Sequence, residues 1–202
     1  MKNKLYLILS IIFIIVISVV FCSCKRKPKT AEENFDFLKT IKSYSTDAIF
    51  SYKNSRGETT ERCKQYYDST KGYRLEIGED RIQIYKDKKI FVQDVKNNAK
   101  YTLEKDFDEL YKYTFIGEYI NLMYTSEDIK YFCKKIEGKN YAVVELFIPG
   151  NNKNINKAVL FINQDNSLPD KLIVYDDRGN ERLQVVYEGF KVEDELDKNL
   201  FM

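Results

Sequence analysis

Cysteine is the residue type whose position in this 202-residue chain most clearly predicts a chemical event. Cys24 follows the apolar segment Leu5–Cys22 and the small residue Ser23, and Lys2 and Lys4 precede that segment. Charged, apolar and small-residue regions in this order are typical of a secretory signal peptide. The residues just before Cys24 resemble the lipobox of a bacterial lipoprotein. We therefore expect cleavage before Cys24, acylation of its thiol and attachment to the membrane through a diacylglyceryl group.

Two alternatives remain open at this site. Cys22 is a second acceptor for the lipid, although the bulky Phe21 before it is unfavourable. The apolar run of about 18 residues is also long enough to span a bilayer, so an uncleaved anchor is the other alternative. Basic residues after the apolar run outnumber those before it, and a basic excess favours the cytoplasmic side of a membrane. An uncleaved anchor with the domain outside the cytoplasm would therefore have an unfavourable orientation. Cleavage predicts a signal peptide at 1–23, a basic linker against the headgroups at 24–29 and one domain at 30–202.

The composition argues against most catalytic chemistry. The chain has no histidine and no tryptophan, so Ser-His-Asp and Cys-His catalysis and histidine-ligated zinc sites are excluded. It also lacks the glycine-rich motifs that bind phosphates or dinucleotides. We expect a protein that is not an enzyme and that uses no cofactor and no metal.

The charge balance argues against nucleic acid as a partner. The chain has 33 basic and 31 acidic side chains, and loss of the two presequence lysines would leave it formally neutral. Proteins that bind nucleic acid need a basic excess to neutralise phosphates.

Cys63 and Cys133 are the two cysteines of the expected mature domain. Outside the cytoplasm such a pair is a possible disulfide, provided that the two α-carbons lie within about 7 Å of each other. The alternative, which we favour, is that both are small buried apolar residues.

A helix is expected at the start of the domain. Thr30 and Glu33 have the spacing of a capping box, in which each side chain binds the other residue's backbone amide. An apolar stripe follows, formed by Phe37, Leu38, Ile41 and Tyr44. A second helical stretch is expected at 106–124, with a break near Thr114 or Gly117.

Alternating apolar and polar residues between turn residues predict strands in eleven segments. They lie at 47–54, 58–70, 73–77, 81–86, 89–94, 100–104, 129–136, 141–148, 157–163, 171–175 and 181–192. Short turns between successive strands imply antiparallel neighbours. The fold class is therefore α+β: a large curved antiparallel sheet, an open half-barrel, with the N-terminal and central helices on its concave face.

Several segments resemble the LolA-like lipoprotein-carrier superfamily. They are Leu38–Ser45, Lys71–Ile77, Leu168–Leu172, Tyr175–Asn180 and Leu196–Phe201. The resemblance implies the half-barrel fold. It also implies one alternative function, a carrier that holds lipid or an acylated ligand in the cavity, with residues 106–124 as a lid. The other interpretation of that stretch, which we favour, is a permanently packed helix.

The whole chain also resembles the GerS-like germination lipoproteins of clostridia. The similarity lies in the composition rich in Lys, Asn and Ile, the long apolar presequence and Cys22-Ser23-Cys24. It implies a non-enzymatic lipoprotein that binds a cortex N-acetylmuramoyl-L-alanine amidase, permits its activity and is needed for spore germination. The implied location is the extracytoplasmic face of a membrane, between the two forespore membranes in spores.

Aromatic residues supply the only direct indication of a binding surface. The chain has 16 Tyr and 13 Phe, and tyrosine is enriched at protein interfaces. Tyr66 and Tyr67 are weak candidates, because neighbours in a strand point to opposite faces and at least one is expected to be exposed. Most other rings are expected in the core. The edges of an open sheet also predict, weakly, a homodimer through strand addition or exchange.

Overall fold

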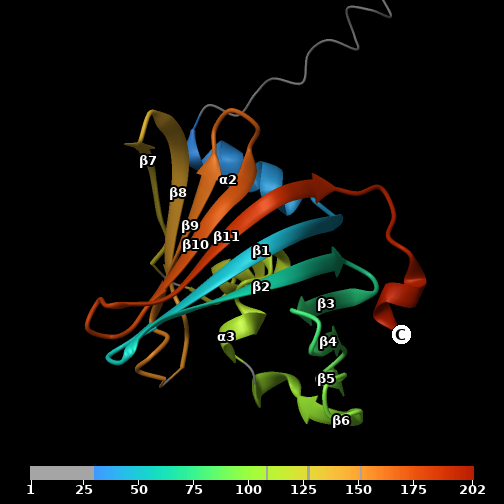
Figure 1. Cartoon of the computed structure of the whole chain (residues 1–202). Helices are drawn as coiled ribbons and strands as arrows, with labels where there is room; N and C mark the ends of the chain where they lie inside the picture. The colour runs from blue at the N-terminus through green and yellow to red at the C-terminus, as the bar shows by residue number, and fades with distance from the viewer. Residues whose placement is uncertain (1–29, 108, 127, 151) are drawn as a thin grey trace, which may run out of the picture.

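The computed structural model describes residues 30–202 except 108, 127 and 151. In this part of the chain eleven strands form one antiparallel sheet, in the order β6-β5-β4-β3-β2-β1-β11-β10-β9-β8-β7. Figure 1 shows the sheet curving around α2 and the yellow-green α4, which lie behind it in this view. The side that faces these helices is the concave face. The predicted open half-barrel with helices on the concave face is confirmed.

All expected strands are present, with shifts of a few residues at their ends. They are β1 (Ser43–Asn54), β2 (Gly57–Asp68), β3 (Gly72–Ile77), β4 (Arg81–Lys86), β5 (Lys89–Asp94), β6 (Ala99–Glu104), β7 (Lys130–Ile136), β8 (Lys139–Phe147), β9 (Lys157–Asn163), β10 (Leu168–Tyr175) and β11 (Glu181–Val192). The helices are α2 (Ala31–Lys39), α3 (Glu109–Lys112) and α4 (Ile116–Met123), with 3-10 turns η1 (Lys105–Phe107) and η2 (Lys198–Phe201).

The capping box at the start of α2 is confirmed. The Glu33 amide donates to Thr30 Oγ1 at 3.0 Å, and the Thr30 amide donates to Glu33 Oε2 at 3.0 Å. The predicted apolar stripe is partly wrong, because α2 ends at Lys39 and Tyr44 belongs to β1, opposite Tyr67 on β2.

The face of α2 that packs on the sheet differs accordingly. It carries Ala31, Phe35 and Leu38, whereas Phe37 is 37% exposed. Burial of the three apolar side chains, rather than helix propensity, stabilises so short a helix.

The sheet consists of two meanders that meet at the pairing of β1 with β11. Strands β3 to β6 form a wing, which joins the rest of the sheet only through the second half of β2, from Cys63 to Asp68. A tight turn leads into the wing at Gly72, whose φ is +107°. A side chain there would collide with the backbone carbonyl of Tyr85, so the turn requires glycine.

The main core lies between the concave face and the helices. Its largest fully buried side chains are aromatic or aliphatic: Tyr44, Tyr85, Tyr119, Phe35, Phe50, Phe115, Leu38, Leu75, Ile90, Ile116, Leu146 and Leu160. A second, smaller apolar cluster lies on the convex face over β8 to β10, around Val143, Phe161 and Ile173. Strands β8 and β9 are therefore apolar on both faces, which explains their nearly continuous hydrophobic sequences.

Candidate interaction surface

The concave face of the sheet is closed by side chains that hold α4 in place. Tyr119 Oη donates to the carbonyl of Val144 on β8 at 2.8 Å. Tyr187 Oη donates to the carbonyl of Thr114 at 2.6 Å, just before α4. The Ile116 amide donates to Tyr44 Oη at 3.1 Å. Three elements of the sheet thus bind α4 and its first residues, which is the geometry of a packed helix.

The break before α4 lies at Thr114, one of the two predicted positions. Thr114 is fully buried, and its hydroxyl accepts from Gln65 Nε2 at 2.9 Å. The other position, Gly117, lies within α4, where a side chain would press on the ring of Tyr67 at 3.0 Å. Glycine therefore serves close packing there rather than a break in the helix.

A partly buried ion pair ties η1 to α4. Lys105 Nζ lies 2.6 Å from Glu118 Oε1, and the Glu118 side chain is 8% exposed. Because a buried carboxylate is unfavourable without a partner, this pair fixes the path of the chain between β6 and α4. The chain from Thr114 to Tyr119 is therefore held by the core on several sides.

The other polar cluster near the core consists of two phenols and one carboxylate. Tyr52 Oη donates to Tyr111 Oη at 2.6 Å, and Tyr111 Oη lies 3.2 Å from Glu61 Oε2. Burial raises the pKa of both Tyr52 and Tyr111 above the ordinary range of tyrosine. The phenols thus stay protonated at physiological pH and act as hydrogen-bond donors. Among the residues that the structure describes, no cluster of three or more His, Cys, Asp or Glu side chains is arranged to hold a metal.

The two candidate tyrosines point to opposite faces of β2, as their adjacency predicts. Tyr67 packs in the core, with its ring centroid 5.0 Å from that of Tyr73. Tyr66 lies on the convex face in a row with Ser45 and Arg74. It lines a shallow pocket beside Lys64, and its side chain is half-buried. Of the two, only Tyr66 faces outward.

Cys63 and Cys133 are both free in the structure. Cys63 lies on β2 and Cys133 on β7, and five strands separate these two in the sheet order. The possible disulfide, which was the alternative that we did not favour, is therefore not formed. The expectation that both are buried is right for Cys63 and wrong for Cys133, which lies exposed on an edge strand. The lipid-acceptor candidates Cys22 and Cys24 lie outside the described residues.

The chain after β11 folds back onto the convex face of the wing. Lys71 Nζ donates to the carbonyl of Leu196 at 3.0 Å, and Arg74 Nη1 donates to that of Leu200 at 3.0 Å. Phe201 is only 4% exposed. Two basic side chains thus hold backbone oxygens of this tail while its aromatic ring is buried.

A groove of about 430 Å³ lies beside this tail, on strands β4 to β6. Cross-strand partners share a face of the sheet, and Arg74, Ile84, Phe91 and Thr102 form one such row. Ile84 is 8% exposed, whereas Phe91 is 45% exposed. This groove was not predicted from the sequence. Strand alternation predicts that Ile84 and Phe91 share a face of the sheet. It does not predict that the tail, with Phe201 and Met202, forms one wall of the groove.

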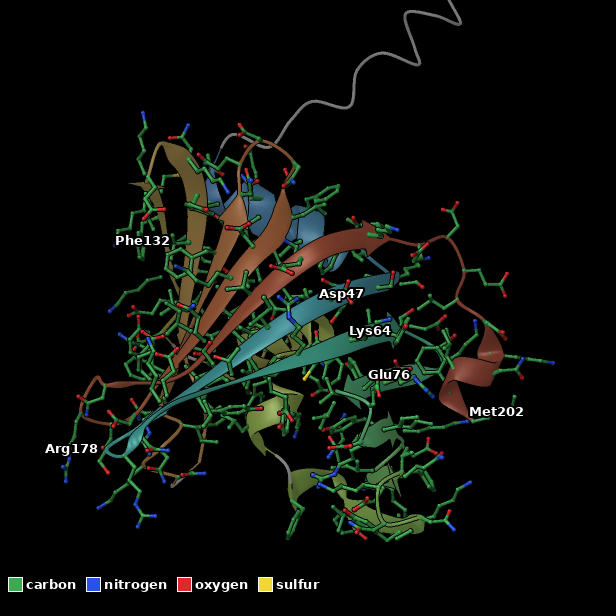
Figure 2. The ribbon with its side chains drawn as sticks, viewed as in Figure 1. Asp47, Lys64, Glu76, Phe132, Arg178 and Met202 are labelled. Atoms are coloured by element: carbon green, nitrogen blue, oxygen red, sulfur yellow. The ribbon has the colours of Figure 1, made fainter. Side chains whose placement is uncertain are left out.

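Figure 2 shows the convex face with its charged side chains. Asp47, Lys64 and Glu76 follow one another across β1, β2 and β3, so opposite charges alternate from strand to strand. None of the helices in the described part of the chain combines the length and apolar character of a membrane span.

The family comparison gives a match along nearly the entire chain. The model of the YdcC-like sporulation proteins matches residues 2–201. A search of curated proteins found no match.

Solved structures give matches at several levels of identity. An uncharacterized conserved protein from Thermus thermophilus is 10% identical, with a TM-score of 0.55 and coverage of 84% of this chain and 91% of that chain. At this identity the likeness supports the fold alone. A LolA superfamily protein from Nitrosomonas europaea is 15% identical, with a TM-score of 0.44 over 86% of this chain and 98% of that chain.

One match has a higher sequence identity. The GerS lipoprotein of Clostridioides difficile, whose structure was solved in complex with the CwlD amidase, is 28% identical to this chain. The match covers 84% of this chain and 99% of that chain, with a TM-score of 0.48.

Proposed function

The chain belongs to the family of YdcC-like sporulation proteins, and on that premise we propose that it binds and activates a cortex-modifying peptidoglycan amidase. It does so as a membrane-anchored lipoprotein without catalytic activity of its own, and spores need it to germinate. The acylated residue is Cys24. The protein lies on the extracytoplasmic face of a membrane, between the two forespore membranes.

The observation that carries this proposal is the sequence likeness to GerS. At 28% identity the match extends over 99% of the GerS chain that was solved in complex with its amidase. The expected resemblance to the GerS-like lipoproteins is thereby confirmed. The absence of histidine supports a binding role rather than a hydrolytic one, because the usual catalytic bases and zinc ligands are missing.

The alternative function, a carrier for lipid or an acylated ligand, has less support. A carrier needs an interior that opens, and α4 would be its lid. Tyr119, Tyr187 and Tyr44 instead bind α4 and its first residues to the sheet. Opening would leave buried hydroxyls and carbonyls without partners, at a cost of about 1–3 kcal/mol for each.

Co-purification and activity measurements test the amidase proposal. The full chain is co-expressed with the cortex amidase of the same organism, and amidase activity on cortex peptidoglycan is measured with and without it. We expect a stable complex and a rise in activity. The LolA superfamily protein from Nitrosomonas europaea serves as a fold control and should do neither. An amidase that is equally active alone, with no complex formed, would refute the proposal.

A further inference from the structure

The tail after β11 shows what kind of segment the convex face of the wing binds. It buries the aromatic ring of Phe201 against the strands, and its backbone oxygens accept hydrogen bonds from Lys71 and Arg74. The wing thus holds an apolar side chain together with oxygen acceptors. Asp68, the last residue of β2, keeps Lys71 in place: its Oδ2 atom lies 3.0 Å from Lys71 Nζ.

The groove on strands β4 to β6 lies on the same face, beside the tail. It also combines apolar and basic side chains, but no segment of the described chain covers it. Phe91 lies next to Ile84 in one cross-strand row, and Ile82, Gln93 and Lys100 form the next row. Phe91 is 45% exposed, although burial of an aromatic side chain away from water is favourable. The groove therefore presents an aromatic floor that another side chain would bury.

The charged side chains that line the groove are all basic: Arg74, Lys86 and Lys100. Arg74 is already engaged, because its Nε lies 2.8 Å from Glu76 Oε1 and its Nη1 binds the tail. Lys86 and Lys100 form no ion pair within the described residues, and both are exposed. Two unpaired ammonium groups beside an apolar floor are complementary to a segment in which carboxylates flank an apolar side chain.

Resting on the proposed function, we infer that this groove is the docking site for the amidase partner. The partner contributes a segment with an aromatic or long aliphatic side chain flanked by Asp or Glu. The apolar side chain packs on Phe91 beside Phe201, and the carboxylates accept from Lys86 and Lys100. Figure 2 shows Met202 at this end of the molecule and Phe132 at the opposite edge of the sheet.

Phe132 and Lys134 on β7 provide matched controls. Phe132 is 42% exposed and also lies on the convex face, opposite Val143 of the outer cluster. Strands β6 and β7 are the two edges of the sheet, so Lys100 and Lys134 are both exposed edge-strand lysines.

The first experiment measures the affinity of the full chain for the amidase. We expect Phe91→Ser and Lys100→Glu each to weaken binding at least about tenfold, and Phe132→Ser and Lys134→Glu to leave it unchanged. Thermal unfolding confirms that the variants fold. Equal affinities for all four variants would overturn the inference and leave the proposed function intact.

The second experiment probes the groove without the amidase. Because the chain has no tryptophan, Phe91→Trp introduces a single reporter, and Phe132→Trp is its control. The titrant is a tryptophan-free peptide with phenylalanine between glutamates, compared with the same peptide carrying lysines. A saturable blue shift at position 91 with the glutamate peptide alone supports the inference. If the wild-type chain fails to bind the amidase, the proposed function is refuted. The titration still decides whether the groove binds an apolar segment flanked by acidic residues.

Discussion

Cys63 and Cys133 are the same residue type in opposite surroundings. Cys63 faces the core, and burial, with a smaller contribution from the charge of Glu61, raises the pKa of its thiol to about 12. Cys133 is exposed on β7, where its sulfur accepts from Gln164 Nε2 at 3.3 Å. Thiol reactivity depends on the thiolate, so the two should differ strongly towards alkylating and disulfide reagents.

Thiol labelling of the folded full chain at pH 8 should distinguish them. We expect Cys133→Ser to remove a fast-reacting thiol and Cys63→Ser to leave the fast phase unchanged. Cys63 should react only after the chain is unfolded, because at pH 8 little of a thiol with a pKa of about 12 is ionised. Failure to label either residue without prior reduction would show that they pair after all.

At the residue scale, local patterns were predictable and exposure was not. The capping box of Thr30 and Glu33 depends on residues three apart, so the sequence alone is enough to identify it. The exposure of Cys133 depends on β7 being an edge strand, which only the order of all eleven strands determines. Tyr66 and Tyr67 show both a predictable and an unpredictable property. Strand alternation predicts that they point to opposite faces, but not how much of each side chain is exposed to solvent.

Helix α4 is the element whose role the sequence left open between a lid and a packed helix. Its hydrophobic residues fit both, since an apolar stripe covers a core or closes a cavity equally well. The difference lies in its hydrogen bonds to the sheet, above all the one from Tyr119 to Val144. Burial raises the pKa of the Tyr119 phenol well above its ordinary value, so this donor is permanent.

Tyr119→Phe should therefore lower the free energy of unfolding by about 1–2 kcal/mol, because a buried carbonyl loses its donor. Tyr124→Phe, at the end of the same helix, is the control and should have no effect, since Tyr124 is 76% exposed. Denaturant unfolding monitored by circular dichroism measures both. Equal stabilities for the two variants would mean that α4 is not anchored as described, and would revive the lid interpretation.

Strand positions were the most predictable elements, because alternation and turn residues are local. The apolar stripe predicted for the N-terminal helix was wrong at its end, because the pairing of Tyr44 with Tyr67 between two strands outweighs the continuing apolar period. The groove on the wing was not predictable. It depends on a contact between Arg74 and Leu200, which lie 126 residues apart in the chain.

At the scale of the whole molecule, the proposed lipid on Cys24 places one binding surface at one membrane. A protein that acts only by binding gains from this, because confinement to the membrane raises its effective concentration for a partner there. The open curved sheet itself was predictable from the succession of short antiparallel strands, and the structure has it.

Cys24→Ser should release the chain from the membrane fraction, whereas Cys22→Ser should leave it attached. Fractionation followed by metabolic labelling with palmitate measures both properties. Loss of label with unchanged membrane retention would favour an uncleaved anchor. Loss of label only in Cys22→Ser would move the acylation site to that residue.

The seam between β1 and β11 also affects how the chain reaches its folded state. Each meander pairs strands that are neighbours in sequence, but the seam joins Tyr44 to Val192, near the two ends of the domain. Such high contact order slows folding, because the loop-closure entropy must be overcome before the pairing forms. In the export that the proposed signal peptide implies, the N-terminal meander would therefore wait, with its apolar face uncovered, until the last strand has crossed the membrane.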